Sequence, residues 1–167
     1  MRAGIGYDVH RLEKGVPLIL GGTNIPHGKG AVGHSDGDVV SHAVADAVLG
    51  AANLGDIGTH FPSGDRRWKG ISSLVFLTRV AEEVRRRGFG FVHVDCTVVL
   101  QEPRIEPHVG AMKTAMAGAL GIDDRQISVK ATTTDFLGVI GEGRGIAAVA
   151  VATLSLPGSS TQGPDHS

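Results

Sequence analysis

Two hydrophobic patterns alternate along this chain, and the alternation limits the folds that are open to it. Short apolar or alternating segments, typical of strands, are residues 3–13, 17–20, 91–101 and 126–133. Segments with apolar side chains three to four residues apart, typical of helices, are residues 36–52, 70–88 and 103–120. Residues 146–156 are apolar throughout, which predicts a strand covered on both faces. The pattern predicts an α/β or α+β fold, in which helices cover one face of a mixed β-sheet.

The length and composition predict one domain and exclude several classes of protein. A chain of 167 residues predicts a single domain over residues 1–156, followed by a polar tail, residues 157–167, that we expect to be disordered. The net charge of −1 gives no basic field for nucleic acid. Cys96 is the only cysteine, so it predicts no disulfide framework and no cysteine-based zinc site, and we expect it in the core.

No secretory signal or membrane span is visible in the sequence. We therefore expect a cytoplasmic bacterial protein, or a plastid protein if the source is a plant, without a membrane partner. Two stretches carry no regular pattern. Residues 24–33 are glycine-rich and irregular, and residues 53–69 predict a long loop, which in a compact domain is usually functional or mobile.

A candidate metal site lies in the first quarter of the chain. Asp8 and His10 are two residues apart on a predicted strand, so they point to the same face. Asp38, His42 and Asp46 share one face of the predicted helix. Two imidazoles and one carboxylate would leave a coordination position open, as in catalytic zinc sites, and iron, manganese or cobalt would also accept this set. The residues leave open whether Asp8 or Asp38 supplies the carboxylate, and local Asp–His ion pairs are the plainer interpretation.

Candidate anion-binding groups occur twice. His34 and Ser35 precede a helix N-terminus, where free N–H groups suit an anion, and Asp36 or Ser35 is expected to cap that helix. The threonines at 132–134 end a predicted strand and could hold phosphate oxygens, although β-propensity alone also explains them. The carboxylate of Asp135, next in the chain, suits Mg²⁺ beside bound phosphate.

Four ordered motifs together resemble one enzyme family. They are Gly6-Tyr7-Asp8-Val9-His10, Gly33-His34-Ser35-Asp36-Gly37-Asp38 with His42, Gly55-Asp56-Ile57-Gly58 with Phe61-Pro62, and Lys130-Ala131-Thr132-Thr133-Thr134. Over residues 2–156 the chain closely resembles the 2-C-methyl-D-erythritol 2,4-cyclodiphosphate synthase family. The resemblance implies an enzyme of non-mevalonate isoprenoid biosynthesis, a lyase that converts 4-diphosphocytidyl-2-C-methyl-D-erythritol 2-phosphate into the cyclic diphosphate and CMP. It also implies a homotrimer with active sites at the subunit interfaces.

The resemblance assigns roles to individual residues. Asp8, His10 and His42 would hold Zn²⁺ or another divalent transition metal, and Asp135 would hold Mg²⁺ or Mn²⁺. His34 and Thr133 would stabilise the transition state. In one subunit, the implied substrate contacts are Asp8, Val9, His10, His34, Ser35, Asp56, Ile57, Gly58 and the flap Phe61, Pro62, Ser63, Gly64 and Asp65. In the neighbouring subunit, they are Leu100, Gln101, Glu102, Pro103, Arg104, Ile105, Glu106, Thr132, Thr133, Thr134 and Asp135.

The chain departs from the family pattern at two places. Asp135 stands where the family usually has Glu, one methylene longer. The late segment reads Gly141-Glu142-Gly143-Arg144-Gly145, whereas the family usually has Gly-Arg-Gly-Glu-Gly, so the charge order is reversed. Two alternatives to the cyclase therefore remain at this point, a metal-dependent phosphohydrolase and a catalytically silent trimeric module that binds metal and nucleotide.

Overall fold

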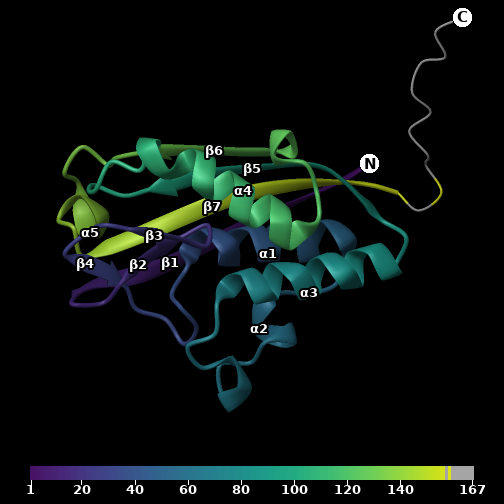
Figure 1. Ribbon diagram of the computed structural model, residues 1–167, viewed down its shortest axis with the longest axis horizontal. Helices are drawn as coiled ribbons and strands as arrows, with labels where there is room; N and C mark the ends of the chain where they lie inside the picture. Colours follow the sequence, from purple (N-terminus) through teal and green to yellow (C-terminus); the bar gives the residue numbers. More distant parts are fainter. Residues whose placement is uncertain (157, 159–167) are drawn as a thin grey trace, which may run out of the picture.

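A computed structural model describes residues 1–156 and residue 158. The predicted tail 157–167 lies outside the described residues, apart from Gly158. The chain forms a five-stranded mixed sheet in the order β4-β1-β7-β5-β6, with a separate two-stranded sheet, β2-β3 (Figure 1). The strands are β1 (Arg2–Lys14), β2 (Leu18–Leu20), β3 (Thr23–Ile25), β4 (Lys29–Ala31), β5 (Gly90–Val99), β6 (Ile127–Thr132) and β7 (Gly145–Ser155). The β5–β6 pair is parallel, and β7 pairs antiparallel with β1 and β5.

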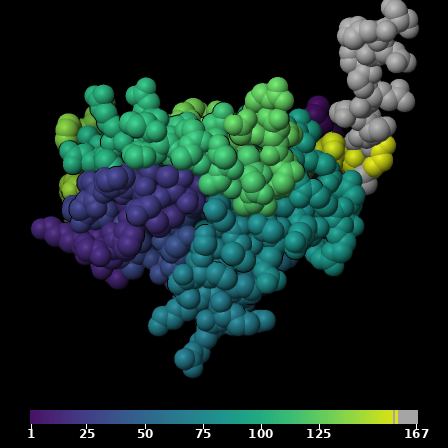
Figure 2. All heavy atoms as spheres, viewed as in Figure 1, coloured from purple at the N-terminus to yellow at the C-terminus, as the bar shows by residue number. Residues whose placement is uncertain are grey.

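Three longer helices cover one face of the large sheet, as the alternation predicts (Figure 1). The helices are α1 (Val39–Ala52), α2 (Ile57–His60), α3 (Ser73–Arg86), α4 (Val109–Leu120) and α5 (Gly138–Gly141), with 3-10 turns η1 (Arg66–Trp68), η2 (Glu106–His108) and η3 (Asp124–Gln126). Helix α1 packs on β1 and β7, α4 packs on β6, and α3 packs against α1 and α4. The segment with α2 and η1 projects away from the sheet (Figures 1 and 2). No helix within residues 1–156 combines the length and the apolar character needed to cross a membrane.

The core lies between the sheet and these helices and is built from small aliphatic side chains. Alternate residues of β7 from Ile146 to Leu154 are fully buried beneath the helices. Cys96 is fully buried opposite Ala150, as expected, and burial raises the pKa of its thiol to about 12. The expectation that β7 is covered on both faces is wrong for a single chain, because Val151 on the other face is 41% exposed.

Several predicted boundaries are also wrong. Residues 24–33 contain β3 and β4, and residues 53–69 contain α2 and η1. The helix expected from residue 103 begins only at η2, and Pro103 follows a cis peptide bond instead of opening a helix. Short elements of this kind are fixed by tertiary contacts, so periodicity over three or four residues does not reveal them.

Helix α1 begins at Val39, and its N-cap is Asp38, not Asp36 or Ser35. The Asp38 side chain is fully buried and accepts hydrogen bonds from the backbone N–H groups of Val40 and Ser41, both at 3.1 Å. It also accepts from the backbone N–H groups of Gly21 and Gly22, at 2.9 and 2.6 Å. Both carboxylate oxygens are therefore committed to the backbone, and Asp38 ties the β2–β3 turn to the start of α1.

Two glycines let α1 approach β1 more closely than any other residue would allow. A Cβ atom at Gly4 would collide with the backbone of Ala47 and Ala51, and a Cβ atom at Gly6 would collide with the carbonyl oxygen of Ala43. The helix backbone therefore lies directly on the strand. The next two residues on the same face of β1 are Asp8 and His10.

We expect Gly6→Ala to destabilise the fold by about 2–3 kcal/mol, because overpacking against rigid backbone forces the helix away from the strand. Gly28→Ala is the matched control, since a Cβ atom there meets nothing within 4 Å, and we expect a change within about 0.5 kcal/mol. Denaturant unfolding of both variants measures the difference. Equal stability of the two variants would contradict the close approach of α1 and β1.

Candidate active site

Asp8, His10 and His42 meet where β1 passes beneath α1. The Oδ2 atom of Asp8 lies 2.8 Å from Nε2 of His10 and 3.0 Å from Nδ1 of His42. One potential ligand atom from each residue lies within 4.8 Å of the other two, and all three residues are half-buried. Asp8, not Asp38, is thus the carboxylate of this cluster, which settles the choice that the residues alone left open.

The backbone orients the first imidazole. Nδ1 of His10 lies 2.6 Å from the carbonyl oxygen of Val32. A carbonyl can only accept, so Nδ1–H donates this bond and the other ring nitrogen, Nε2, faces Asp8. A histidine whose outer nitrogen donates to a carbonyl presents the inner nitrogen to a metal, which is the usual arrangement of metal-binding histidines.

The pKa values of Asp8 and His10 are shifted within the cluster. Burial of Asp8 opposes its ionisation, but hydrogen bonds from His10 and His42 outweigh that effect and hold the pKa of the carboxyl well below its usual range. The hydrogen bond with Asp8 raises the pKa of His10 against the opposing effect of burial. The cluster therefore already stabilises positive charge beside the carboxylate, and this property and its donor set of two nitrogens and one oxygen fit a divalent transition metal.

A cavity of about 410 Å³ opens above the three side chains. Its other lining residues are His34, Ser35, Ile57, Gly58, Phe61, Pro62, Ser63, Gly64, Trp68 and Phe76. Most of the implied contacts of the first subunit therefore share one space with the cluster. Val9 does not, because its side chain lies on the opposite, exposed face of β1.

The floor of the cavity is tied to α1. Asp46, one turn beyond His42, accepts a hydrogen bond of 2.7 Å from the backbone N–H of Ile57 at the start of α2. Asp56 caps α2 by accepting from Thr59 N–H at 2.7 Å, and that bond lowers the pKa of Asp56. One helix thus contributes to the site in two ways. His42 contacts Asp8, and Asp46 positions the segment 56–58.

An aromatic cluster closes one side of the cavity. Phe61 stacks on Phe76 with ring centroids 4.5 Å apart and meets Trp68 edge to face at 5.2 Å. Phe76 in turn lies 5.9 Å from the ring of His42. Within the predicted flap, Phe61 is therefore packed in place, whereas residues 62–64 are exposed and Asp65 is half-buried.

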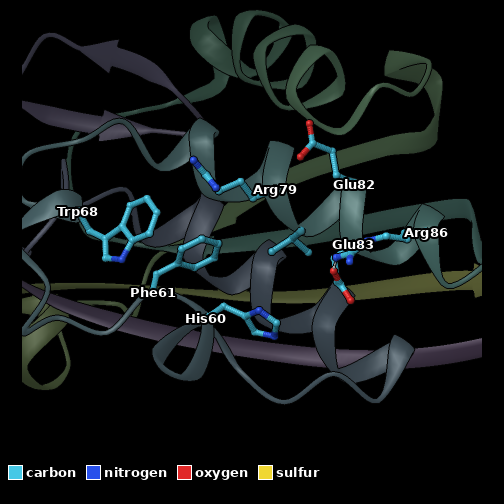
Figure 3. Close-up of a pocket in the computed structure, with 8 residues that line it drawn as sticks. His60, Phe61, Trp68, Arg79, Glu82, Glu83 and Arg86 are labelled. Carbon is cyan, nitrogen blue, oxygen red and sulfur yellow. Dashed lines mark ion pairs between the residues drawn. The ribbon is translucent and has the colours of Figure 1, made fainter.

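Behind this aromatic wall lies a separate cavity of about 370 Å³ (Figure 3). Arg79 of α3 stacks over Trp68 at 5.3 Å, and Arg86 pairs with Glu83 on the same helix. Phe61 is the only residue of the predicted site that lines this cavity among the described residues. The indole nitrogen of Trp68 is buried without a hydrogen-bond partner, and no group of metal-ligating side chains lines this cavity among the described residues, so we assign it no function.

The second group of implied contacts gathers elsewhere on the chain. A cavity of about 310 Å³ is lined by Leu100, Gln101, Pro103, Arg104, Ile105, Glu106, Ala131, Thr132 and Thr133. Glu102 lines the cavity next to it. Asp135 adopts a positive φ of 49° and donates its backbone N–H to Oγ1 of Thr133 at 3.3 Å. Among the described residues, this cavity and the one above the Asp8 cluster have no lining residue in common.

The reversed charges of the late segment pair locally. Nε of Arg144 lies 2.7 Å from Oε2 of Glu142, and both side chains are mostly exposed. The pair lies in neither of the two cavities that hold the implied substrate contacts. Its position therefore supports no substrate contact within one chain.

Four residues around the Asp8 cluster were not predicted from the sequence: Val32, Trp68, Ser73 and Phe76. Val32 contributes only a carbonyl group, so its side chain carries no signal. Trp68 lies in the range predicted as a long loop, and Phe76 lies in a predicted helix, where an aromatic residue is ordinarily part of the core. Ser73 lies 31 residues beyond His42 in the chain, and its hydroxyl approaches His42 only because α3 packs against α1.

The chain is similar to one protein family in both sequence and structure. The sequence profile of the YgbB family matches residues 1–155. The chain is 55% identical over 158 residues to the 2-C-methyl-D-erythritol 2,4-cyclodiphosphate synthase of Pelotomaculum thermopropionicum, which covers 95% of this chain and 98% of the relative. A solved 2C-methyl-D-erythritol-2,4-cyclodiphosphate synthase in its CDP-bound form has a TM-score of 0.84 and 38% identity, over 92% of this chain and all of that one. The bifunctional IspDF of Campylobacter jejuni has a TM-score of 0.88 and 40% identity, over 92% of this chain and 42% of that one.

We expect the protein to bind one zinc or cobalt ion per chain and to lose it on treatment with a chelator. Replacing His42 with alanine removes one ligand nitrogen and should weaken zinc binding roughly 100-fold or more. His93→Ala is the control, because His93 is exposed on β5 and outside the cluster. Competition with a chromophoric chelator measures both affinities. Unchanged zinc affinity in His42→Ala would show that the cluster is only a local network of ion pairs.

Proposed function

The chain belongs to the YgbB family, and from this membership and its site we infer that it converts 4-diphosphocytidyl-2-C-methyl-D-erythritol 2-phosphate into 2-C-methyl-D-erythritol 2,4-cyclodiphosphate and CMP. The enzyme is a lyase of isoprenoid biosynthesis. The observation that carries this conclusion is the Asp8, His10 and His42 cluster. It lies intact at the bottom of an open cavity, in a chain with 55% identity to a named synthase.

The reaction needs no nucleophile from the protein, and its main requirement is that the two reacting phosphate groups of the substrate be held together. The 2-phosphate of the substrate attacks the β-phosphorus, a new P–O–P bond forms, and the bond to the α-phosphate breaks, so that CMP leaves with the bonding electrons. A phosphate dianion needs no general base. The chain of Ser35, His42 and Asp8 that lines the cavity, with 3.0 Å at each step, is therefore not required as a nucleophile triad. Holding the two phosphates together in a folded substrate can contribute roughly 7–11 kcal/mol.

We propose that Asp8, His10 and His42 hold Zn²⁺ and that Asp135 holds Mg²⁺. Such ions, when bound, neutralise phosphate charge and act as Lewis acids. Asp135 is one methylene shorter than the usual Glu, but it follows the threonine run at the end of β6, next to the cavity lined by Thr132 and Thr133.

The remaining cavity residues would recognise the substrate. His34 and Ser35 stand at the edge of the cavity and would donate hydrogen bonds to phosphate oxygens, and Thr133 would do so from the second group. The segment Asp56–Gly58 would contact the methylerythritol part, where Asp46 already fixes the start of α2. The flap residues 61–65 would cover it, with Phe61 as the packed end of the flap.

The separation of the two cavities supports an active site completed by a second copy of the chain. One cavity holds the metal cluster, and the other holds the implied nucleotide contacts, with no described lining residue in common. The uncovered face of the large sheet carries Ile5, Tyr7 and Val9, which are 71%, 60% and 51% exposed. An apolar sheet face of this kind is typical of a subunit interface. We propose a homotrimer in which neighbouring chains contribute one cavity each.

Turnover by the metal-free protein, with zinc and magnesium added separately and together, tests this function. We expect CMP and the cyclic diphosphate in equal amounts, and only when both metals are present, because each metal neutralises a different part of the diphosphate. Phosphorus NMR identifies the products. Free inorganic phosphate in place of the cyclic product would indicate the phosphohydrolase, and the absence of any product would indicate a silent binding module.

A further inference from the structure

His42 has a second hydrogen-bonding partner on the side away from Asp8. Its Nε2 atom lies 2.9 Å from the hydroxyl oxygen of Ser73 and 3.0 Å from that of Ser35. Ser73 is the first residue of α3 and is fully buried, whereas Ser35 is half-buried and lines the cavity. Ser35 faces the cavity where substrate would bind, whereas Ser73 does not line it. The Ser73 hydroxyl can therefore keep its hydrogen bond to His42 when the cavity is occupied.

Ser73 is itself held by Asp36. The Ser73 hydroxyl lies 2.5 Å from Oδ1 of Asp36, and the Ser73 backbone N–H donates to Oδ2 at 2.9 Å. Asp36 is fixed in turn, because its backbone N–H donates to the carbonyl oxygen of Ile71 at 3.1 Å. Both carboxylate oxygens of Asp36 therefore bond to one serine, 37 residues away in the chain, and Oδ1 also accepts a hydrogen bond of 3.2 Å from the backbone N–H of Asp38.

The chemistry of these groups sets the direction of the hydrogen bonds. A carboxylate only accepts, and a hydroxyl has a single hydrogen, so the Ser73 hydroxyl donates to Asp36. Its oxygen can then only accept from His42, which requires a hydrogen on Nε2. A hydrogen on Nε2 leaves Nδ1, which lies 3.0 Å from Oδ2 of Asp8, as the ring nitrogen available to a metal ion.

We propose that Asp36 and Ser73 are positioning residues of the metal centre, which hold His42 with Nε2 protonated and Nδ1 directed at the metal. In this way each imidazole is oriented by a hydrogen bond to the ring nitrogen that does not face Asp8. The Val32 carbonyl does so for His10, and the Asp36–Ser73 pair does so for His42. This inference rests on the proposed metal site and adds two residues that never touch substrate.

Two variants test the proposal by different means. Ser73→Ala removes the acceptor of the Nε2 hydrogen. Asp36→Asn keeps the volume but reverses the direction, because its oxygen must accept the Ser73 N–H and its NH₂ group then donates to the Ser73 hydroxyl. The hydroxyl would then donate to His42 Nε2 and place the ring hydrogen on Nδ1, the nitrogen needed for the metal. Ser72→Ala is the control, since Ser72 is exposed and caps the same helix.

We expect both variants to bind zinc about 10- to 100-fold more weakly than the wild type, and Ser72→Ala to bind as the wild type does. In NMR spectra of the zinc-loaded protein, the Nε2 proton of His42 should shift and exchange faster with water in Ser73→Ala. Circular dichroism establishes whether each variant is folded. If Ser73→Ala does not fold, the zinc affinity of Asp36→Asn is the result that decides.

Zinc affinity within twofold of the wild type in the folded variants would overturn the positioning role and leave the metal site intact. Failure of the wild type itself to bind zinc would overturn both the metal site and this inference. The two failures are therefore distinguishable in one set of titrations.

Discussion

The contact between the backbones of β1 and α1 is the constraint on which the rest of the site depends. Gly4 and Gly6 have no Cβ, so the helix rests directly on the strand, and Asp8 and His10 follow on the same face. At this separation, one turn into α1, the imidazole of His42 reaches the Asp8 carboxylate. Larger residues at the glycines would lift the helix and separate the three side chains. The same two positions therefore determine both core packing and the metal cluster.

The parts of this arrangement that follow local periodicity could be predicted from sequence. The two-residue spacing placed Asp8 and His10 on one strand face, and the four-residue spacing placed His42 and Asp46 on one helix face. The contact between Asp8 and His10 confirms the first prediction. The second prediction also included Asp38 and is wrong for that residue, because Asp38 is the N-cap of α1 and its carboxylate faces Gly21 and Gly22. Periodicity could not decide between Asp8 and Asp38, because the answer depends on the β2–β3 turn, whose Gly21 and Gly22 N–H groups occupy the Asp38 carboxylate. The role of a residue such as Ser73 likewise depends on how two helices pack.

The implied contacts of the proposed site are divided between two cavities of the chain. Strand β1 and helix α1 hold the cluster of Asp8, His10 and His42, whereas the implied nucleotide contacts lie near the C-terminal ends of β5 and β6, around a separate cavity. The proposed substrate carries a diphosphate between a methylerythritol part and a cytidine, and under the proposed function it would contact both sets of groups. An assembly that places one chain's metal cavity against its neighbour's second cavity would allow both contacts and cover the apolar sheet face.

Activity of mixed assemblies tests this account most directly. His42→Ala disables the metal cavity and Thr133→Ala disables the nucleotide cavity, and each variant alone should be nearly inactive. In a trimer that contains both variants, one of the three interfaces pairs an intact metal cavity with an intact nucleotide cavity, so such trimers should recover about one third of the wild-type rate. Co-expression with two affinity tags isolates them. If the mixed assemblies are as inactive as their parents, each chain must carry its own complete site, and the shared active site is contradicted.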